Sequence, residues 1–195
     1  MNEAYRFLKQ CLFIGIGVTT VFLNLSVHPH ELQENRASLV LRNDRQVNVT
    51  FYLNMSEVLQ KTLTPTQDRF EHTAKLSAMN EGEFLKQYGI TKNLIESSVI
   101  FRSASGKQLK ITDWQWPEPR VMQKGLRDLT MQSVVGSGHH FHENPFEIRL
   151  HIQSTEPLES LTLELPVTLK PITLVASRPK QKRFDNSTTK VTINF

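Results

Sequence analysis

Apolar and polar residues alternate with a period of two along several segments of this chain. In the segment QVNVTFYLN (46–54), the apolar side chains fall on every second position and would share one face of a strand. The preceding segment SLVLRND ends in Asn43-Asp44, a pair that favours a tight turn. Residues 37–53 therefore predict a β-hairpin with one apolar and one polar face.

The same alternation returns in four later segments, 146–153, 161–165, 172–176 and 191–195. Two more apolar runs flank Ser105-Gly106, which predicts a second hairpin over 97–114, closed at that turn. Strands with a single apolar face are typical of antiparallel sheets that pack on one side. The last alternating segment, KVTINF, predicts a closing strand with Phe195 in the core.

Helical signals interrupt this alternation in the first half of the chain. Asn54 precedes Glu57 by three positions, and Asn80 precedes Glu83 in the same way, which is the spacing of a helix N-cap. Gly89 predicts the end of the helix that begins after Asn80.

Another helical pattern lies within residues 118–135. Met122, Leu126 and Leu129 would share one helical face, although Gly125 weakens this helix by roughly 1 kcal/mol.

Taken together, these patterns predict a mainly β fold with short helices inserted. We expect residues 28–195 to form a single antiparallel, immunoglobulin-like β-sandwich domain, with helical insertions near 54–96 and 118–135. Residues 66–79 fit a strand or a helix equally well. A chain of 195 residues is long enough for one domain with a substantial core and too short for two comfortable ones.

The N-terminal region has the pattern of an export signal. Arg6 and Lys9 precede residues 11–27, an apolar run of seventeen residues without a charged side chain. We therefore expect residues 1–27 to be a signal peptide or an uncleaved anchor helix, with 11–27 as an inner-membrane tether in the second case. In both cases the domain would be periplasmic or otherwise extracytoplasmic.

Charge and composition narrow the function classes. The formal net charge is +4, and lysine and arginine are scattered apart from RPKQKR at 178–183, so we expect no nucleic-acid partner. The single cysteine, Cys11, lies in the apolar run, which excludes an intrachain disulfide. Since the chain has no serine-hydrolase, P-loop or dinucleotide-binding signature, we predict no enzyme.

Five of the seven histidines fall in two clusters. His28 and His30 flank a proline just after the apolar run, and His139, His140 and His142 follow a flexible Gly-Ser-Gly segment. Several imidazole nitrogens close together suit copper, nickel or zinc. The clusters predict a transition-metal site, and the alternative is a solvent-exposed polar loop.

Three further residues are singled out by their type and position. Trp114 and Trp116, two positions apart, form a candidate aromatic binding surface, and the alternative is that they pack against the core and under a loop. His72 stands alone in RFEHTAK and is expected at the surface.

The segment HPHELQENRASLVLRNDRQVNVTFYLN (28–54) resembles uncharacterised proteobacterial exported proteins that begin with H-P-H-E and continue as a β-domain. More weakly, it is similar to the extracytoplasmic portion of the HupE/UreJ-like membrane proteins. The resemblance covers about thirty residues. It implies a metal-related accessory role outside the cytoplasm, with a membrane protein as a candidate partner.

We therefore expect an exported protein that binds or hands over a transition metal through the two histidine clusters. The alternative is a periplasmic binding or assembly module without a metal, whose working surface is a sandwich face or the edge formed by Trp114 and Trp116. A third hypothesis is a copper enzyme with an N-terminal histidine brace, which requires a mature chain that begins at His28.

Overall fold

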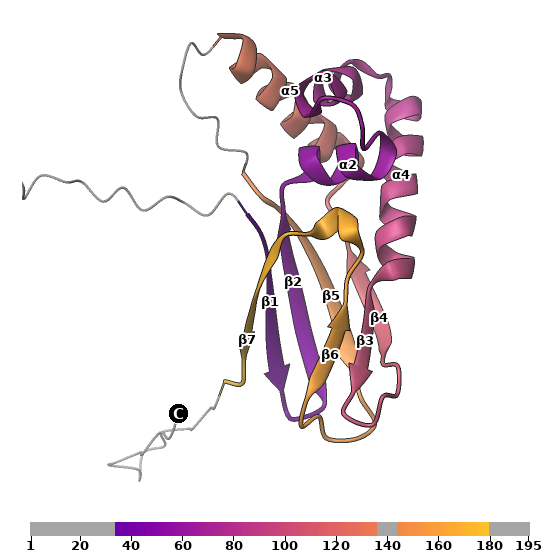
Figure 1. The fold of residues 1–195 in the computed structure, drawn as a ribbon, viewed down its shortest axis with the longest axis vertical. Coiled ribbons are helices and arrows are strands. Elements are labelled where there is room, and N and C mark those ends of the chain that lie inside the picture. Colours follow the sequence, from indigo (N-terminus) through magenta and orange to yellow (C-terminus); the bar gives the residue numbers. More distant parts are fainter. Residues whose placement is uncertain (1–33, 136–143, 180–195) are drawn as a thin grey trace, which may run out of the picture. The chain divides into compact units, whose positions relative to one another are not determined.

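The computed structural model describes residues 34–135 and 144–179, which belong to one compact unit (Figure 1). Its elements follow in the order β1 (Asn35–Arg42), β2 (Gln46–Leu53), α2 (Met55–Leu63), α3 (Arg69–Ala78), α4 (Glu81–Ser98), β3 (Ile100–Ser103), β4 (Lys110–Gln115), α5 (Pro119–Val135), β5 (Phe146–Gln153), β6 (Leu161–Glu164), η2 (Val167–Leu169) and β7 (Ile172–Ser177). The helices gather at one end of the strands, the helical end. The connections 43–45, 104–109 and 154–160 lie at the opposite end, the loop end (Figure 1).

The strands of the described ranges form two sheets. Five strands pair in the order β4-β5-β2-β1-β7, and β3 pairs with β6 in a separate two-stranded sheet. All pairs are antiparallel except β1 and β7, which run parallel. A parallel neighbour requires a long crossover, and here the whole chain between residues 43 and 171 separates the two strands.

The core of the large sheet follows the alternation of its sequence. β2 and β5 pair at the centre of the sheet, with Val49 opposite Leu150 and Phe51 opposite Ile148. These four side chains are at most 1% exposed. Burying an aliphatic or aromatic side chain of this kind contributes roughly 1.5–3 kcal/mol, so this face stabilises the pairing of β2 with β5.

The predicted hairpin over residues 37–53 is confirmed. β1 and β2 pair antiparallel from Arg36 opposite Tyr52 to Arg42 opposite Gln46. Asn43 and Asp44 both have positive φ angles, 49° and 58°. This is the backbone of the tight turns whose twist matches that of paired strands, and asparagine and aspartate tolerate it better than most residues.

The helix starts are confirmed and one predicted stop is wrong. The side chain of Asn54 accepts a hydrogen bond from the Glu57 amide at the start of α2, and that of Asn80 accepts one from Glu83 at the start of α4. However, α4 continues through Gly89 to Ser98, because its buried residues keep a helical spacing on both sides of that glycine.

Residues 66–79, which fit a strand or a helix from the sequence, contain helix α3. The Asp68 side chain caps it by accepting hydrogen bonds from the amides of Phe70 and Glu71. The predicted helical insertion near 118–135 is also present, as α5.

The second predicted hairpin has the correct turn and the wrong partners. The Gly106 amide donates to the Ser103 carbonyl, and one bridge joins Arg102 to Gln108. Beyond that bridge the two strands separate, because β3 pairs with β6 and β4 pairs with β5. The turn is a local feature, whereas each strand takes its partner from a distant part of the chain.

The expected combination of paired strands with inserted helices is therefore present, in a mixed α/β structure. The five- and two-stranded division and the parallel β7 do not clearly match an immunoglobulin-like sandwich. Among the residues described, no helix is both long and apolar enough to cross a bilayer. The predicted signal peptide or anchor, residues 1–27, lies outside the described residues, as does the predicted closing strand at 191–195.

Candidate functional site

The histidine clusters lie outside the part of the chain that the structure describes. This applies to His28 and His30 and to His139, His140 and His142. Within residues 34–135 and 144–179, no group of three or more histidine, cysteine, aspartate or glutamate side chains is arranged to hold a metal ion. The metal site thus stays a prediction from the sequence.

His151, on the polar face of β5, is engaged within the sheet. Its Nδ1 lies 2.8 Å from Oδ1 of Asn48 on β2, and its Nε2 lies 3.9 Å from a carboxylate oxygen of Asp113 on β4. It lies five positions after Phe146, the first residue of β5, which corresponds to roughly 17 Å of strand. His151 therefore takes part in polar contacts that cross β2, β5 and β4. It lies near the end of β5 that is distant from Phe146.

The two tryptophans take part in a row of aromatic rings between β4 and α4. Trp114 and Trp116 are half-buried, and their rings stack with centroids 5.9 Å apart. The Trp116 ring meets Tyr88 edge to face at 6.1 Å, and Tyr88 stacks on Phe84 at 6.0 Å. Both indoles pack against the core, so much of their apolar surface stabilises the contact between β4 and α4.

Hydrogen bonds fix this aromatic row at its polar atoms. The Trp116 indole N–H donates to the Glu96 carboxylate at 2.8 Å, and the Tyr88 hydroxyl donates to the Pro117 carbonyl at 2.8 Å. Burial, assisted by the nearby Glu96 charge, raises the pKa of the Tyr88 phenol. Tyr88 is therefore a neutral structural donor, and it is not a general base at physiological pH.

His72 is buried, which corrects the expectation that it lies at the surface. It is 3% exposed, its Nδ1 lies 2.7 Å from Oγ1 of Thr64, and none of the described residues hydrogen-bonds to its Nε2. Burial, and secondarily the Lys75 charge, lower its pKa. The sequence around His72 gave no sign of this burial, because His72 lies on the face of α3 that packs into the helical end.

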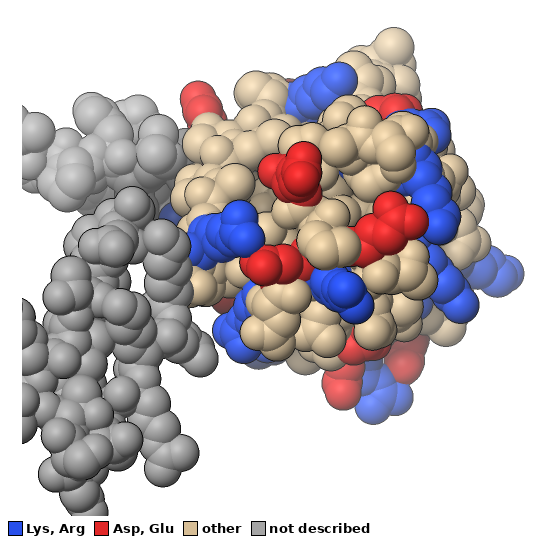
Figure 2. Space-filling view, turned by 90° about the horizontal axis from the view of Figure 1, so that it is seen from below, with Lys and Arg blue, Asp and Glu red and all other residues tan. Residues whose placement is uncertain are grey.

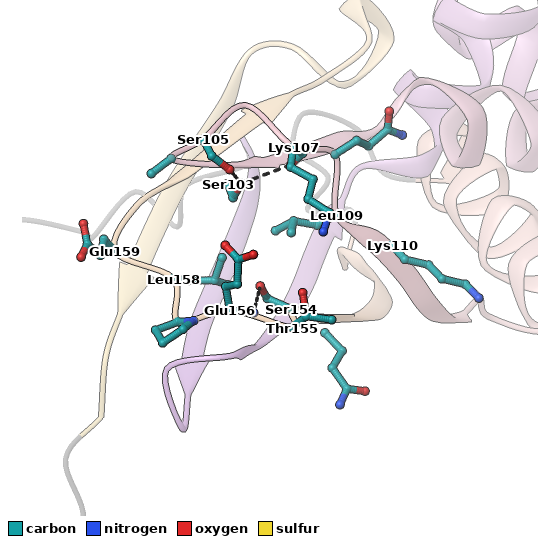
Figure 3. Close-up of a pocket in the computed structure, with 14 residues that line it drawn as sticks. Ser103, Ser105, Lys107, Leu109, Lys110, Ser154, Thr155, Glu156, Leu158 and Glu159 are labelled. Carbon is teal, nitrogen blue, oxygen red and sulfur yellow. Dashed lines mark hydrogen bonds between the residues drawn. The ribbon is translucent and has the colours of Figure 1, made fainter.

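A hollow lies at the loop end, between the β3–β4 and β5–β6 connections (Figure 3). Its volume is about 510 Å³. The largely buried side chains of Leu109 and Leu158 provide apolar surface in its lining. The polar lining comes from Ser103, Ser105, Lys107, Gln108, Lys110, Gln153, Ser154, Thr155, Glu156 and Glu159.

A second hollow of about 600 Å³ adjoins the first. The two share Lys110, Gln153, Ser154 and Thr155, and the second adds Asn43, Arg45, Gln46 and Thr112. We refer to the combined surface as the loop-end groove.

Backbone hydrogen bonds hold the loops of this groove in place. The Leu158 amide donates to the Asp44 carbonyl at 2.6 Å, and the Ser154 amide donates to the Arg45 carbonyl at 2.8 Å. The Glu156 amide donates to the Ser154 hydroxyl at 3.2 Å. Since the β5–β6 connection is thereby tied to the β1–β2 turn, the groove is formed before any ligand arrives.

The charges of the groove are mixed, with a cationic excess. Three cationic residues, Arg45, Lys107 and Lys110, line the groove together with two carboxylates, Glu156 and Glu159. None of these three cations makes an ion pair with another described residue. Figure 2, which views the loop end, shows lysine and arginine interspersed with aspartate and glutamate across this surface.

The side chains of the groove provide hydrogen-bond donors and acceptors. Its lining contains neither histidine nor cysteine. The Ser103 hydroxyl lies 2.9 Å from that of Ser105, so it is not paired with a general base. This arrangement suits reversible hydrogen bonding to a polar ligand.

Sequence reasoning did not find this groove, because its side chains come from three connections far apart in the chain. The only signals were turn residues, Asn43-Asp44 and Ser105-Gly106, which mark loops without showing that they meet. Comparison of the chain with protein-family models, curated proteins and solved structures finds no match.

Proposed function

We propose that this chain is an exported binding module that takes a polar, acidic ligand in the loop-end groove. The observation that carries the proposal is the groove itself, a preformed hollow lined by three cations without ion-pair partners among the described residues. The proposal includes an immunoglobulin-like arrangement of the two sheets, since domains of that build bind ligands through the loops at one end.

The chemistry of the groove selects the ligand class. Arg45, Lys107 and Lys110 would attract a carboxylate or another anionic group, while the serine and threonine hydroxyls and Glu156 would bind donors and acceptors beside it. Leu109 and Leu158 are 7% and 5% exposed, so these two side chains offer little surface to a hydrophobic ligand. An acidic oligosaccharide combines these features, and we propose it as the ligand class.

Calorimetric titration of the purified full-length chain with acidic and neutral oligosaccharides of matched length tests this proposal. We expect affinity for the acidic ligands alone. We also expect Lys110→Gln, which alters the lysine shared by both hollows, to weaken it about tenfold, as a charge-assisted hydrogen bond would.

The matched control is Lys86→Gln on the exposed surface of α4, which also removes one lysine but lies outside the lining. It should leave the affinity unchanged. Equal binding of acidic and neutral ligands, or equal loss in the two variants, would reject the groove as the binding site.

The histidine clusters favour a second candidate function, the handling of a transition metal outside the cytoplasm. Under this proposal His139, His140 and His142, with His28 and His30 as a second cluster, bind copper, nickel or zinc. The chain would then deliver its metal to a membrane-protein partner.

Titration of the full-length chain with Cu(II), Ni(II) and Zn(II) measures this function directly. Replacing His139, His140 and His142 together by alanine should abolish the tightest site, whereas His151→Asn should not, since His151 is engaged with Asn48 in the sheet. An affinity that survives the triple replacement would refute the loop site. The proposal of a non-enzymatic role for the chain would fall if copper loading produced oxidase activity.

Both candidate functions include export of the chain. We infer export from the basic flank and the apolar run of residues 1–27. N-terminal sequencing of the mature protein tests it. A start near residue 28 indicates a cleaved signal, and an intact N-terminus on a protein that resists a salt wash of membranes indicates the tether. A mature start other than His28 removes the histidine brace, and an intact chain in the cytosolic fraction removes export altogether.

A further inference from the structure

The two hollows of the loop-end groove differ in charge. The second hollow is lined by two cations, Arg45 and Lys110, and by no carboxylate. The first hollow shares Lys110 and adds Lys107 together with Glu156 and Glu159, so its cations and carboxylates balance. Figure 3 shows Glu156 among the labelled residues of the first hollow, whereas the Lys110 side chain extends away from it. The second hollow is therefore the more favourable place for an anionic group.

Neutral hydrogen-bonding side chains lie between the two cations of the second hollow. Gln153 on β5 stands opposite Gln46 on β2 and opposite Lys110 on β4, so the three side chains form one row across three strands. Side chains that stand directly opposite each other in this way are about 5 Å apart. Arg45 directly precedes Gln46, and its carbonyl accepts from the Ser154 amide at 2.8 Å. A carboxylate here could take hydrogen bonds from both cationic and carboxamide donors.

Two carboxylates adjoin the second hollow in the sequence, and both are engaged with other side chains. Asp44 pairs with the Arg178 guanidinium at 2.5 Å. Asp113 accepts from the Gln115 carboxamide at 2.8 Å and lies 3.9 Å from Nε2 of His151. Neither aspartate belongs to the lining. The cations of the second hollow thus keep their charge available to a ligand.

The first hollow suits a neutral unit that carries hydroxyl groups. Glu156 and Glu159 make no ion pair with another described residue, so their oxygens can accept hydrogen bonds from such a unit. The hydroxyls of Ser103 and Ser105 lie in the same lining. A ligand carboxylate placed beside the two glutamates would instead be repelled.

We propose that the ligand alternates, with an acidic unit in the second hollow and an adjoining neutral unit in the first. This inference rests on the proposed binding of an acidic oligosaccharide. The hollows share four lining residues, so two consecutive units would occupy them. A saccharide with a carboxylate on every unit would place one beside Glu156 and Glu159. We expect this to weaken its binding by roughly fivefold, the effect of one like charge at contact distance in water.

Calorimetric titration of the full-length chain with two tetrasaccharides tests the alternation. One probe alternates a uronate with an N-acetylhexosamine, and the other contains uronate alone. The alternating probe should bind roughly fivefold more tightly, although it carries fewer charges. Replacing Glu156→Gln and Glu159→Gln together should strengthen binding of the all-uronate probe and bring the ratio of the two affinities close to one.

The matched control replaces Glu71→Gln and Glu83→Gln together. These glutamates lie on the exposed surfaces of α3 and α4, outside both linings, and the ratio should keep its original value. Because each ratio compares two ligands on the same protein, any change in the folded fraction affects both alike.

The outcomes separate this inference from the function on which it rests. Equal or tighter binding of the all-uronate probe would overturn the alternation and leave the groove as a site for acidic saccharides. A preference that persists after both groove glutamates are replaced would overturn it in the same way. Failure of both probes to bind would refute the proposed function, and the alternation with it.

Discussion

At the scale of single residues, Gly125 and Gly89 differ in whether the surrounding structure leaves space for a side chain. Both lie inside helices, where glycine costs about 1 kcal/mol relative to alanine. A Cβ atom built at Gly125 would lie 2.6 Å from Cζ of Phe146, whereas one at Gly89 would have no atom within 4 Å. Gly125 therefore allows α5 to approach the start of β5, and Gly89 has no such role.

We predict that Gly125→Ala destabilises the protein by about 1–3 kcal/mol, despite the better helix propensity of alanine. The ring of Phe146 packs against the core and meets the new methyl group end-on, so it must shift from its place. Gly89→Ala should instead stabilise the protein by about 0.5–1 kcal/mol. Urea unfolding of both variants checks the pair, and equal effects would contradict the contact with Phe146.

His72 predicts a dependence of stability on pH. Because burial lowers its pKa below the ordinary 6.5, the unfolded chain binds a proton at pH values where the folded chain does not. The contribution of the neutral ring is complete above 6.5 and declines as the pH falls from there toward the lowered pKa. Urea unfolding between pH 7.5 and 5 should show this decline in the unmodified protein.

The variant His72→Gln provides the comparison, since glutamine can hydrogen-bond to Thr64 but has no titrating group in this range. Its free energy of unfolding should fall less steeply over the same pH interval. Parallel pH profiles for the two proteins would show that the ring of His72 is protonated in the folded state as easily as in the unfolded state.

At the scale of elements, a buried asparagine joins three of them. Asn35 at the start of β1 is 2% exposed; its Oδ1 accepts from the Asn54 amide at 2.8 Å, and its Nδ2 donates to the Leu169 carbonyl at 3.3 Å. Asn54 in turn caps α2. One side chain thus links β1, the junction of β2 with α2, and η2.

We predict that Asn35→Leu lowers the free energy of unfolding by about 2 kcal/mol or more, because it removes the partners of the part-buried Asn54 amide and of the buried Leu169 carbonyl. Asn80→Ala serves as the comparison, since it removes one exposed capping bond and should cost about 1 kcal/mol. Thermal or urea unfolding measures both. A loss for Asn35→Leu no greater than that for Asn80→Ala would mean that the bridge between elements contributes little.

The helices and strands also show which features could be predicted from the sequence. Caps and turns at Asn54, Asn80 and Asn43-Asp44 depend on neighbours within a few residues, and all three were predicted correctly. The partner of β3 was not, because a strand of four residues can pair with any complementary edge. The helix end predicted at Gly89 was wrong for a related reason. The packing of Phe84, Tyr88 and Ile95 outweighs the unfavourable helix propensity of glycine.

At the scale of the whole molecule, the large sheet brings together residues that no sequence window contains. The loop-end groove combines Arg45, Lys110 and Thr155, which meet because β2, β4 and β5 are neighbours in one sheet. The parallel pairing of β7 with β1 likewise joins segments more than 130 residues apart. Neither could be inferred from alternation, which shows which face of a strand is buried but not which strand lies beside it.

The sequence alone determined the apolar faces of the strands, the helix caps and the first hairpin, because these depend on side-chain periodicity and on bonds between near neighbours. It also determined where histidines cluster, and hence where a metal should be sought. Only the tertiary structure decided the strand order, the burial of His72 and the meeting of three loops in one groove. These depend on contacts between distant segments, whose free energy comes from the shared core and not from any one stretch of chain.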